Sequence, residues 1–285
     1  MTIAHTNSGT ALAALFVVGT GKPGRNIPWK RWLLFMAPLW LYQLCLSVTL
    51  QIDLSVLKGG VAALGRDAGL STVAAAETAS RLAGFYRAAQ TFAFVPYQLI
   101  LSVTFVVFPM ISQAVTLGDH QATQRYIRTA MRFSLIVLLA IAAPVSGAAA
   151  GVMRVAYPDA YLAGSDALAL LSLGMVCFAL FTVASTALSG AGRPGLPAGI
   201  ALVMVALVIG CNMLFIRLVG VNEHTLAALA AGTSLGMAFG LCAVGVAVQL
   251  RFGTFLAPLT ALRVSFAGGV GWAVRIIFTL IFGKE

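Results

Sequence analysis

Long apolar runs, separated by polar or turn-forming segments, dominate the pattern of this chain. About 20 helical residues cross the ~30 Å hydrocarbon core of a bilayer. The pattern therefore predicts an all-α polytopic transmembrane bundle with six spans, at about residues 33–57, 84–114, 127–152, 167–188, 197–218 and 226–250. A shorter Gly-rich run over residues 265–282 is either a seventh span or a segment at the membrane interface.

The segments outside and between these runs divide the chain into three regions. Residues 1–32 form an N-terminal tail, with the apolar run Ala11–Gly19 that is too short to span and the basic loop Gly21–Arg31. Residues 33–250 form a six-span membrane lobe, and residues 251–285 form a basic loop and a short C-terminal membrane segment. Within the lobe, Lys58–Ala83 is rich in small residues and is expected to be a long loop with a short amphipathic helix over Ser71–Arg81.

The second predicted span, Gly84–Ala114, differs from a plain apolar helix. It contains two prolines, and Pro96 is able to kink it, while Pro109 lies near its end. At 100° per residue, one face of this helix collects Tyr86, Gln90, Tyr97 and Thr104. Because lipid cannot satisfy polar groups, this face predicts an internal cavity, which we expect to be shared with a lobe that the chain lacks.

Composition supports membrane insertion, since 60% of the residues are hydrophobic and only 9% are charged. The formal net charge of +10 is typical of basic loops on the cytoplasmic side and does not favour nucleic-acid binding. With the Gly21–Arg31 loop in the cytoplasm, ten basic residues fall in inside loops and six in outside loops. The pattern places a multi-pass protein in the inner (plasma) membrane with this orientation.

Asp53 is the only one of the eight acidic residues that lies inside a spanning run. An acid within the membrane is a functional candidate, here for ion coupling; alternatively, Asp53 has already reached the far interface. The four cysteines lie in apolar runs without CxxC spacing, and the three histidines lie far apart. No metal site and no cofactor are predicted.

Five pieces of the chain, in order, resemble the polysaccharide and O-antigen flippase family, within the multidrug/oligosaccharidyl-lipid/polysaccharide exporter superfamily. The pieces are QIDLSVLK, AGFYRAAQTFAFVPYQLILSVTFVVFPMIS, YIRTAMRF, AYPDAYLAGSDALALLSLG and LSGAGRPGLP. The resemblance covers about residues 32–250. It implies two helix bundles related by a pseudo-two-fold axis, and transport of a lipid-linked saccharide through a central cavity by alternating access.

Families of this kind have about twelve to fourteen spans, and the matching pieces resemble the C-terminal half. The chain is therefore expected to be one lobe of a MATE-like transporter fold. Its expected partners are membrane lipids, the lipid-linked substrate, and a missing first lobe, a separate half-protein or a second copy of the chain.

The resemblance also implies a small set of substrate contacts. Arg87 lies at the outer mouth of the second span, where it meets a sugar phosphate or simply reaches the interface. Arg193 lies in the GRP turn, where fixing the loop is the alternative role. Polar contacts to the sugar, or else hydrogen bonds between helices, are expected from Tyr42, Gln43, Gln90 and Tyr97.

Two other functions compete with the flippase. A cation-coupled multidrug exporter of the same fold would use Asp53 to carry a proton or sodium ion. A lipid-linked glycosyltransferase would need an acidic pair or base on a membrane-facing loop, and the predicted outer loops contain no DxD motif. We therefore expect a transporter and not an enzyme.

Overall fold

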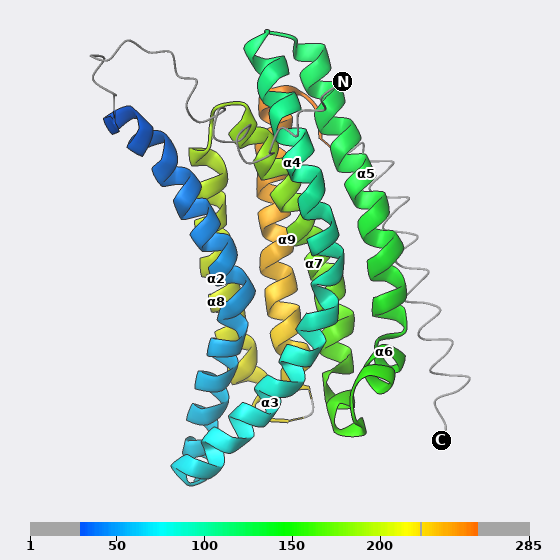
Figure 1. The fold of residues 1–285 in the computed structure, drawn as a ribbon. Coiled ribbons are helices and arrows are strands. Elements are labelled where there is room, and N and C mark those ends of the chain that lie inside the picture. The colour runs from blue at the N-terminus through cyan, green and yellow to red at the C-terminus, as the bar shows by residue number, and fades with distance from the viewer. Residues whose placement is uncertain (1–28, 223, 256–285) are drawn as a thin grey trace, which may run out of the picture. The chain divides into compact units, whose positions relative to one another are not determined.

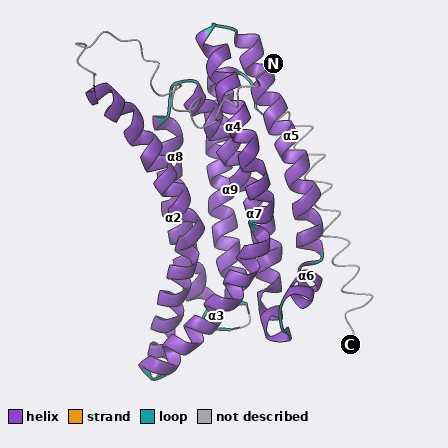
Figure 2. Ribbon diagram, in the orientation of Figure 1, coloured by secondary structure: helices purple, strands orange, loops and turns teal. Residues whose placement is uncertain are grey.

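The structure of the chain is a computed structural model that describes residues 29–222 and 224–255. Every secondary-structure element in these ranges is helical (Figure 2). The chain divides into two compact units, Met1–Ala37 and Pro38–Glu285. Only the start of one helix is described in the first unit, and all the packing below concerns the second.

Short turns connect the helices, which follow in sequence order (Figure 1). Their bounds are α2 Trp29–Asp67, α3 Thr72–Ala93, α4 Val95–Thr116, α5 His120–Gly147, α6 Ala149–Ala156, the 3-10 helix η1 Asp159–Gly164, α7 Ser165–Gly190, α8 Gly195–Val219 and α9 Thr225–Phe252.

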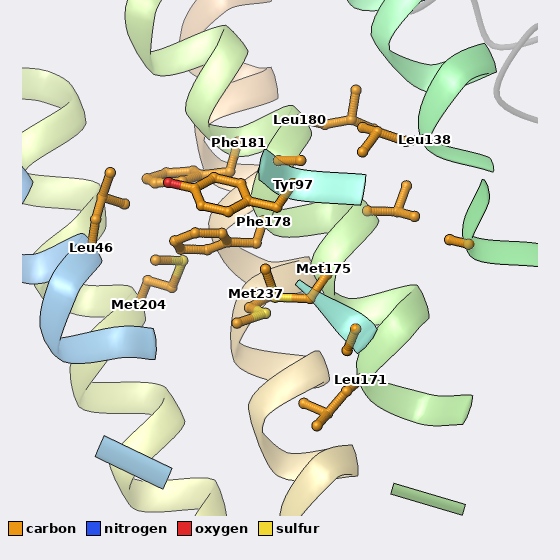
Figure 3. Close-up of a cluster of buried hydrophobic side chains, with 14 of the residues drawn as sticks. Leu46, Tyr97, Leu138, Leu171, Met175, Phe178, Leu180, Phe181, Met204 and Met237 are labelled. Carbon is orange, nitrogen blue, oxygen red and sulfur yellow. The ribbon is translucent and has the colours of Figure 1, made fainter. Parts of the chain in front are cut away.

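Helix α7 is the central element of the second unit. Its most apolar window is 83% buried, against 44% or less in each of the other five candidate spans. It packs most extensively on α9, and also on α5, α4 and α3. Phe178 and Phe181 of α7 are fully buried (Figure 3), so the apolar surface of α7 is covered by protein while its neighbours expose theirs to the bilayer.

Close packing of α9 on α8 depends on three glycines of α9. A Cβ atom added at Gly232, Gly236 or Gly240 would collide with a side chain of α8. Their spacing of four residues places them on one face, where small residues let helices approach closely.

Six helices among the described residues are long and apolar enough to cross a membrane. They confirm the predicted all-helical class and the number of spans between residues 33 and 250. The run Ala11–Gly19, the loop residues before Trp29 and the run 265–282 lie outside the described residues, so their assignments stay predictions.

The loop predicted over Lys58–Ala83 is wrong for residues 58–67, whereas the short helix predicted within it over Ser71–Arg81 is confirmed as the start of α3. Helix α2 continues through Lys58 to Asp67, and α3 begins at Thr72 after a turn in which Gly69 has a left-handed backbone with φ of 84°. The Ser71 hydroxyl accepts a hydrogen bond from the Ala74 N–H and caps α3. Small residues occur in loops, but alanine is also the residue that most favours helix.

The single span predicted over Gly84–Ala114 is also interrupted. Helix α3 ends at Ala93, Phe94 is a turn residue, and α4 begins at Val95 with Pro96 in its first turn. Proline has no N–H to donate and its ring clashes with the preceding turn, so the helix direction changes there (Figure 1). Pro109 lies inside α4, which continues through it.

Candidate functional site

A buried polar cluster surrounds Asp53, whose side chain is 1% exposed. Four helices contribute to it. Tyr86 of α3 donates its hydroxyl hydrogen bond to Asp53 Oδ2 at 3.0 Å. Asn212 of α8 donates through Nδ2 to Asp53 Oδ1 at 3.0 Å, and the Thr233 hydroxyl of α9 lies 2.9 Å from the same oxygen. We call Asp53, Tyr86, Asn212 and Thr233 the Asp53 cluster.

Two members of the cluster also contact each other. Asn212 Nδ2 lies 3.0 Å from Thr233 Oγ1, and Thr233 Oγ1 lies 3.3 Å from Asn212 Oδ1. Gly232 makes this approach possible, because a Cβ at that position would collide with Asn212 Oδ1 and would lie 3.2 Å from the Asn212 backbone nitrogen. The glycine face of α9 therefore serves the polar site as well as helix packing.

The electrostatics of Asp53 are unusual for a buried carboxyl group. Within the described ranges no Lys or Arg side chain forms an ion pair with it, and its three hydrogen-bond donors are neutral. A buried unpaired charge is costly. The arrangement therefore favours either a protonated carboxyl group or a bound cation.

The oxygen atoms of the cluster would suit a hard cation. The carboxylate, the amide oxygen of Asn212 and the hydroxyls of Thr233 and Tyr86 are ligands that such ions prefer. The described residues contain no group of three or more His, Cys, Asp or Glu side chains that could hold a metal ion.

Gln90 lies between the Asp53 cluster and the exposed Arg87 side chain. Its Oε1 accepts a hydrogen bond from Arg87 Nη1 at 3.3 Å. The Gln90 side chain lies beside Asp53, and it is 1% exposed. Its Nε2 atom finds no hydrogen-bond acceptor among the described residues. Arg87 itself is exposed.

The polar face predicted along α3 and α4 turns inward, so the prediction that it faces a missing lobe is wrong. Tyr86, Gln90 and Tyr97 are buried within this chain. The Thr104 hydroxyl donates to the Leu101 carbonyl of its own helix. The physical reason is that α7, α2, α8 and α9 supply the partners for this face.

Tyr42 and Tyr97 are part of an aromatic core instead of a free surface. The Tyr97 ring lies 5.1 Å from Phe178 (Figure 3). The Tyr42 ring lies 6.1 Å from Phe181. The Tyr42 hydroxyl has no hydrogen-bond partner among the described residues.

Arg193 lies in the tight turn between α7 and α8 and exposes its side chain. Its backbone N–H donates to the Leu188 carbonyl at 3.2 Å, and Gly192 before it has a left-handed φ of 77°. At Gly190 a Cβ would meet the Phe108 carbonyl oxygen at 3.2 Å. Backbone geometry therefore fixes this turn.

The face of α2 opposite Asp53 and Tyr42 remains open. It carries exposed polar residues at every fourth position, Gln43, Ser47, Gln51 and Ser55. A hollow of about 590 Å³ follows this face. It is also lined by Trp40, Leu44, Val48 and Ile52, of which Trp40 and Leu44 are 77% and 62% exposed. Lys58, seven residues beyond Gln51 and nearly in line with it, is also exposed. We call Gln43, Ser47, Gln51 and Ser55 the α2 polar face.

Comparison with known proteins decides the family. The family model for the lipid II flippase MurJ matches residues 69–284. This chain belongs to the lipid II flippase MurJ family. A solved structure of lipid II flippase MurJ in an inward closed conformation shares the fold, with a TM-score of 0.59 and 16% sequence identity. The match covers 95% of this chain and 58% of that one. No curated protein matches the chain.

Membership of the MurJ family refines the predicted resemblance. The expected superfamily and the multi-pass membrane location are confirmed, and the MurJ family is one of transporters and not of enzymes. Within that superfamily, the family whose model matches is that of the lipid II flippase MurJ, in place of the polysaccharide and O-antigen flippases that the sequence resembles.

Sequence reasoning missed two members of the Asp53 cluster and most of the α2 polar face. Asn212 and Thr233 are polar residues within long apolar runs. A polar residue in one span, where another span carries an acid, is a signal for an interhelical hydrogen bond. The four-residue spacing from Gln43 to Ser55 is likewise a signal in the sequence, because it places these polar residues on one face of a helix.

Proposed function

We propose that this chain forms one lobe of a flippase that carries lipid-linked saccharide precursors, such as lipid II, across the cytoplasmic membrane by alternating access. The observation that carries the proposal is the exposed α2 polar face on a spanning helix. Lipid cannot satisfy those amide and hydroxyl groups, so they require water or another protein surface. Membership of the MurJ family supports the same transport class.

A second lobe would complete the cavity whose wall is the α2 polar face. A further part of a longer polypeptide, a separate half-protein or a second copy of this chain would supply it. The hollow of about 590 Å³ along α2 would then become part of an enclosed space, large enough for a sugar headgroup.

The exposed residues of this side would contact the substrate. Gln43 offers an amide for sugar hydroxyls, and Lys58 and Arg87 offer cations for the pyrophosphate. Tyr42 and Tyr97 are buried in this structure, as is Gln90. Their role as substrate ligands stays a prediction that requires α2 to separate from α3, α4 and α7 during transport.

Photocross-linking tests the cavity wall. A photoreactive amino acid at Ser47 is expected to capture a radiolabelled lipid-linked precursor in membranes. The same amino acid at Leu202, an exposed apolar position on α8, serves as the control and should capture phospholipid only. Equal capture of the precursor at Ser47 and Leu202 would contradict the proposal that the α2 polar face lines the transport cavity.

Asp53 is proposed as the ion-coupling residue of the transport cycle. Support comes from its burial without a cationic partner among the described residues and from the oxygen-rich cluster around it. The same site would serve a cation-coupled drug exporter of this fold, which is the second candidate function.

The variant Asp53→Asn keeps the shape of the side chain and removes its charge. We expect it to abolish the effect of a proton or sodium gradient on transport of the lipid-linked precursor. Loss of gradient-driven drug efflux, with precursor transport unchanged, would favour the exporter. Unchanged ion dependence of all transport would contradict the coupling role.

A further inference from the structure

A second cavity lies between α4 and α5, away from the Asp53 cluster and the α2 polar face. Its volume is about 800 Å³, and the two helices that form it lie side by side (Figure 1). Its lining residues are Val103, Val107, Met110, Asp119, Gln121, Ala122, Arg125, Tyr126, Thr129, Ala130 and Phe133.

The cavity is polar at one end and apolar at the other. Asp119 and Arg125 lie at the start of α5, which is the membrane-interface end, whereas Val103 and Phe133 lie deeper along the helices. Arg125 and Phe133 are eight residues apart, which corresponds to about 12 Å along the helix axis. This depth approaches the thickness of one leaflet, about half of the ~30 Å hydrocarbon core.

The charges at the polar end favour an anion. Arg125 has neither an ion-pair nor a hydrogen-bond partner in the described part of the chain. The Asp119 carboxylate is already engaged, since it accepts the Ala122 N–H at 2.8 Å and caps α5. Arg132 lies on the same helix and is exposed, and Arg128 donates to the Thr254 hydroxyl at 3.2 Å.

The polar groups nearest to Arg125 complete an amphipathic site. Tyr126 and Thr129 also line the cavity, one and four residues beyond Arg125 on α5. Their hydroxyls supply hydrogen-bonding groups for glycerol or ester oxygens, while the apolar wall deeper in the cavity suits an acyl chain. A phosphate with a hydrocarbon tail matches both ends of the cavity.

We propose that the α4–α5 cavity binds an anionic phospholipid of the leaflet at the N-terminal end of α5, with its phosphate on Arg125 and one acyl chain against Val103, Val107 and Phe133. In the predicted orientation this is the cytoplasmic leaflet, where anionic lipids attract basic residues. The site is separate from the transport route proposed above, and it assigns a role to one of the three arginines of α5, which are Arg125, Arg128 and Arg132.

Lipid titration of the purified full chain, followed by native mass spectrometry, tests the site. The probes are phosphatidylglycerol and phosphatidylcholine. We expect Arg125→Gln to weaken phosphatidylglycerol binding about five- to tenfold. The matched variant Arg132→Gln removes the same charge from the same helix outside the cavity, and should change binding less than about twofold.

A second pair of variants tests the cavity itself. Thr129→Trp fills the space from an exposed position and should also lower binding of phosphatidylglycerol, whereas Ser102→Trp, exposed on α4 but outside the lining, should not. Equal losses in the two arginine variants would overturn the site in favour of general surface attraction. Retained binding in Thr129→Trp would overturn it in favour of another occupant, such as the apolar segment 265–282.

Competition separates the phospholipid from the transported substrate. A lipid-linked pyrophosphate precursor is added to the phosphatidylglycerol-bound protein. If the precursor displaces phosphatidylglycerol only at concentrations at which other anionic lipids also displace it, the result supports a phospholipid site. Displacement at much lower precursor concentration, lost in Arg125→Gln, would assign the cavity to the substrate and contradict the proposal.

Discussion

At the scale of single residues, the Asp53 cluster concentrates polar chemistry in an apolar lobe. One carboxyl group meets hydrogen-bond donors from α3, α8 and α9, so four helices, including its own α2, depend on one side chain. A buried carboxyl group that loses a donor bears the full desolvation penalty. The cluster therefore fixes the relative register of these helices as well as offering a place for an ion.

The Thr233 hydroxyl supplies the first residue-scale prediction. Thr233→Val removes one hydroxyl and keeps the side-chain volume, and we expect the fold to lose about 1–3 kcal/mol. Thr182→Val is the control, because the Thr182 hydroxyl is buried but bonds only to the Phe178 carbonyl of its own helix. Thermal unfolding in detergent should show the lower midpoint for the Thr233 variant; equal midpoints would contradict the importance of the cluster.

Gly232 supplies the second residue-scale prediction. Gly232→Ala places a methyl group against Asn212 Oδ1 and should lower the unfolding midpoint by displacing Asn212 from Asp53. Gly199→Ala in α8 meets nothing within 4 Å, and should instead be neutral or stabilise by about 0.5–1 kcal/mol. A Gly232 variant as stable as the Gly199 variant would show that the close approach tolerates a side chain.

At the scale of elements, the change of direction between α3 and α4 is set by one proline. Pro96 cannot donate to the preceding turn, and Phe94 separates the two helices. Because α3 contributes Tyr86 to the Asp53 cluster and α4 contributes Tyr97 to the aromatic core, this joint lies between the two buried sites. A rotation at Phe94 would change either the Tyr86–Asp53 hydrogen bond or the Tyr97–Phe178 ring contact and leave the other in place.

Pro96→Ala restores the missing N–H and should straighten the joint. Spin labels at Val73 and Leu117, both exposed at the far ends of α3 and α4, should move apart in a cysteine-free background. Pro109→Ala is the control, because α4 already continues through Pro109. An unchanged distance in the Pro96 variant, measured by double electron–electron resonance, would assign the bend to tertiary packing.

The elements also show how far the sequence could predict the structure. Apolar run length identified all six spans, since the bilayer imposes that length whatever the packing. The extension of α2 and the inward turn of the α3–α4 polar face were not predictable in this way. Periodicity places Tyr86 and Gln90 on one face, but only tertiary packing decides that Asp53 lies opposite them.

At the scale of the whole molecule, the polar groups of the lobe lie in two different environments. The Asp53 cluster is buried within the described chain, while the α2 polar face is open. Asp53 could be singled out from the sequence because an acid in a span is rare. The α2 polar face has no such signal, because glutamine and serine carry no charge. Only their spacing of four residues marks one side of a helix.

The central claim is that the α2 polar face lines a water-filled transport cavity. Labelling with a membrane-impermeant maleimide tests it most directly, with single cysteines at Ser47, at Gln51 and, as the lipid-facing control, at Leu202, in membranes containing the otherwise cysteine-free protein. We predict that the cysteines at positions 47 and 51 react and are protected by an added lipid-linked precursor, while the cysteine at position 202 remains unlabelled. Failure of positions 47 and 51 to react, or equal labelling of all three, would contradict the cavity.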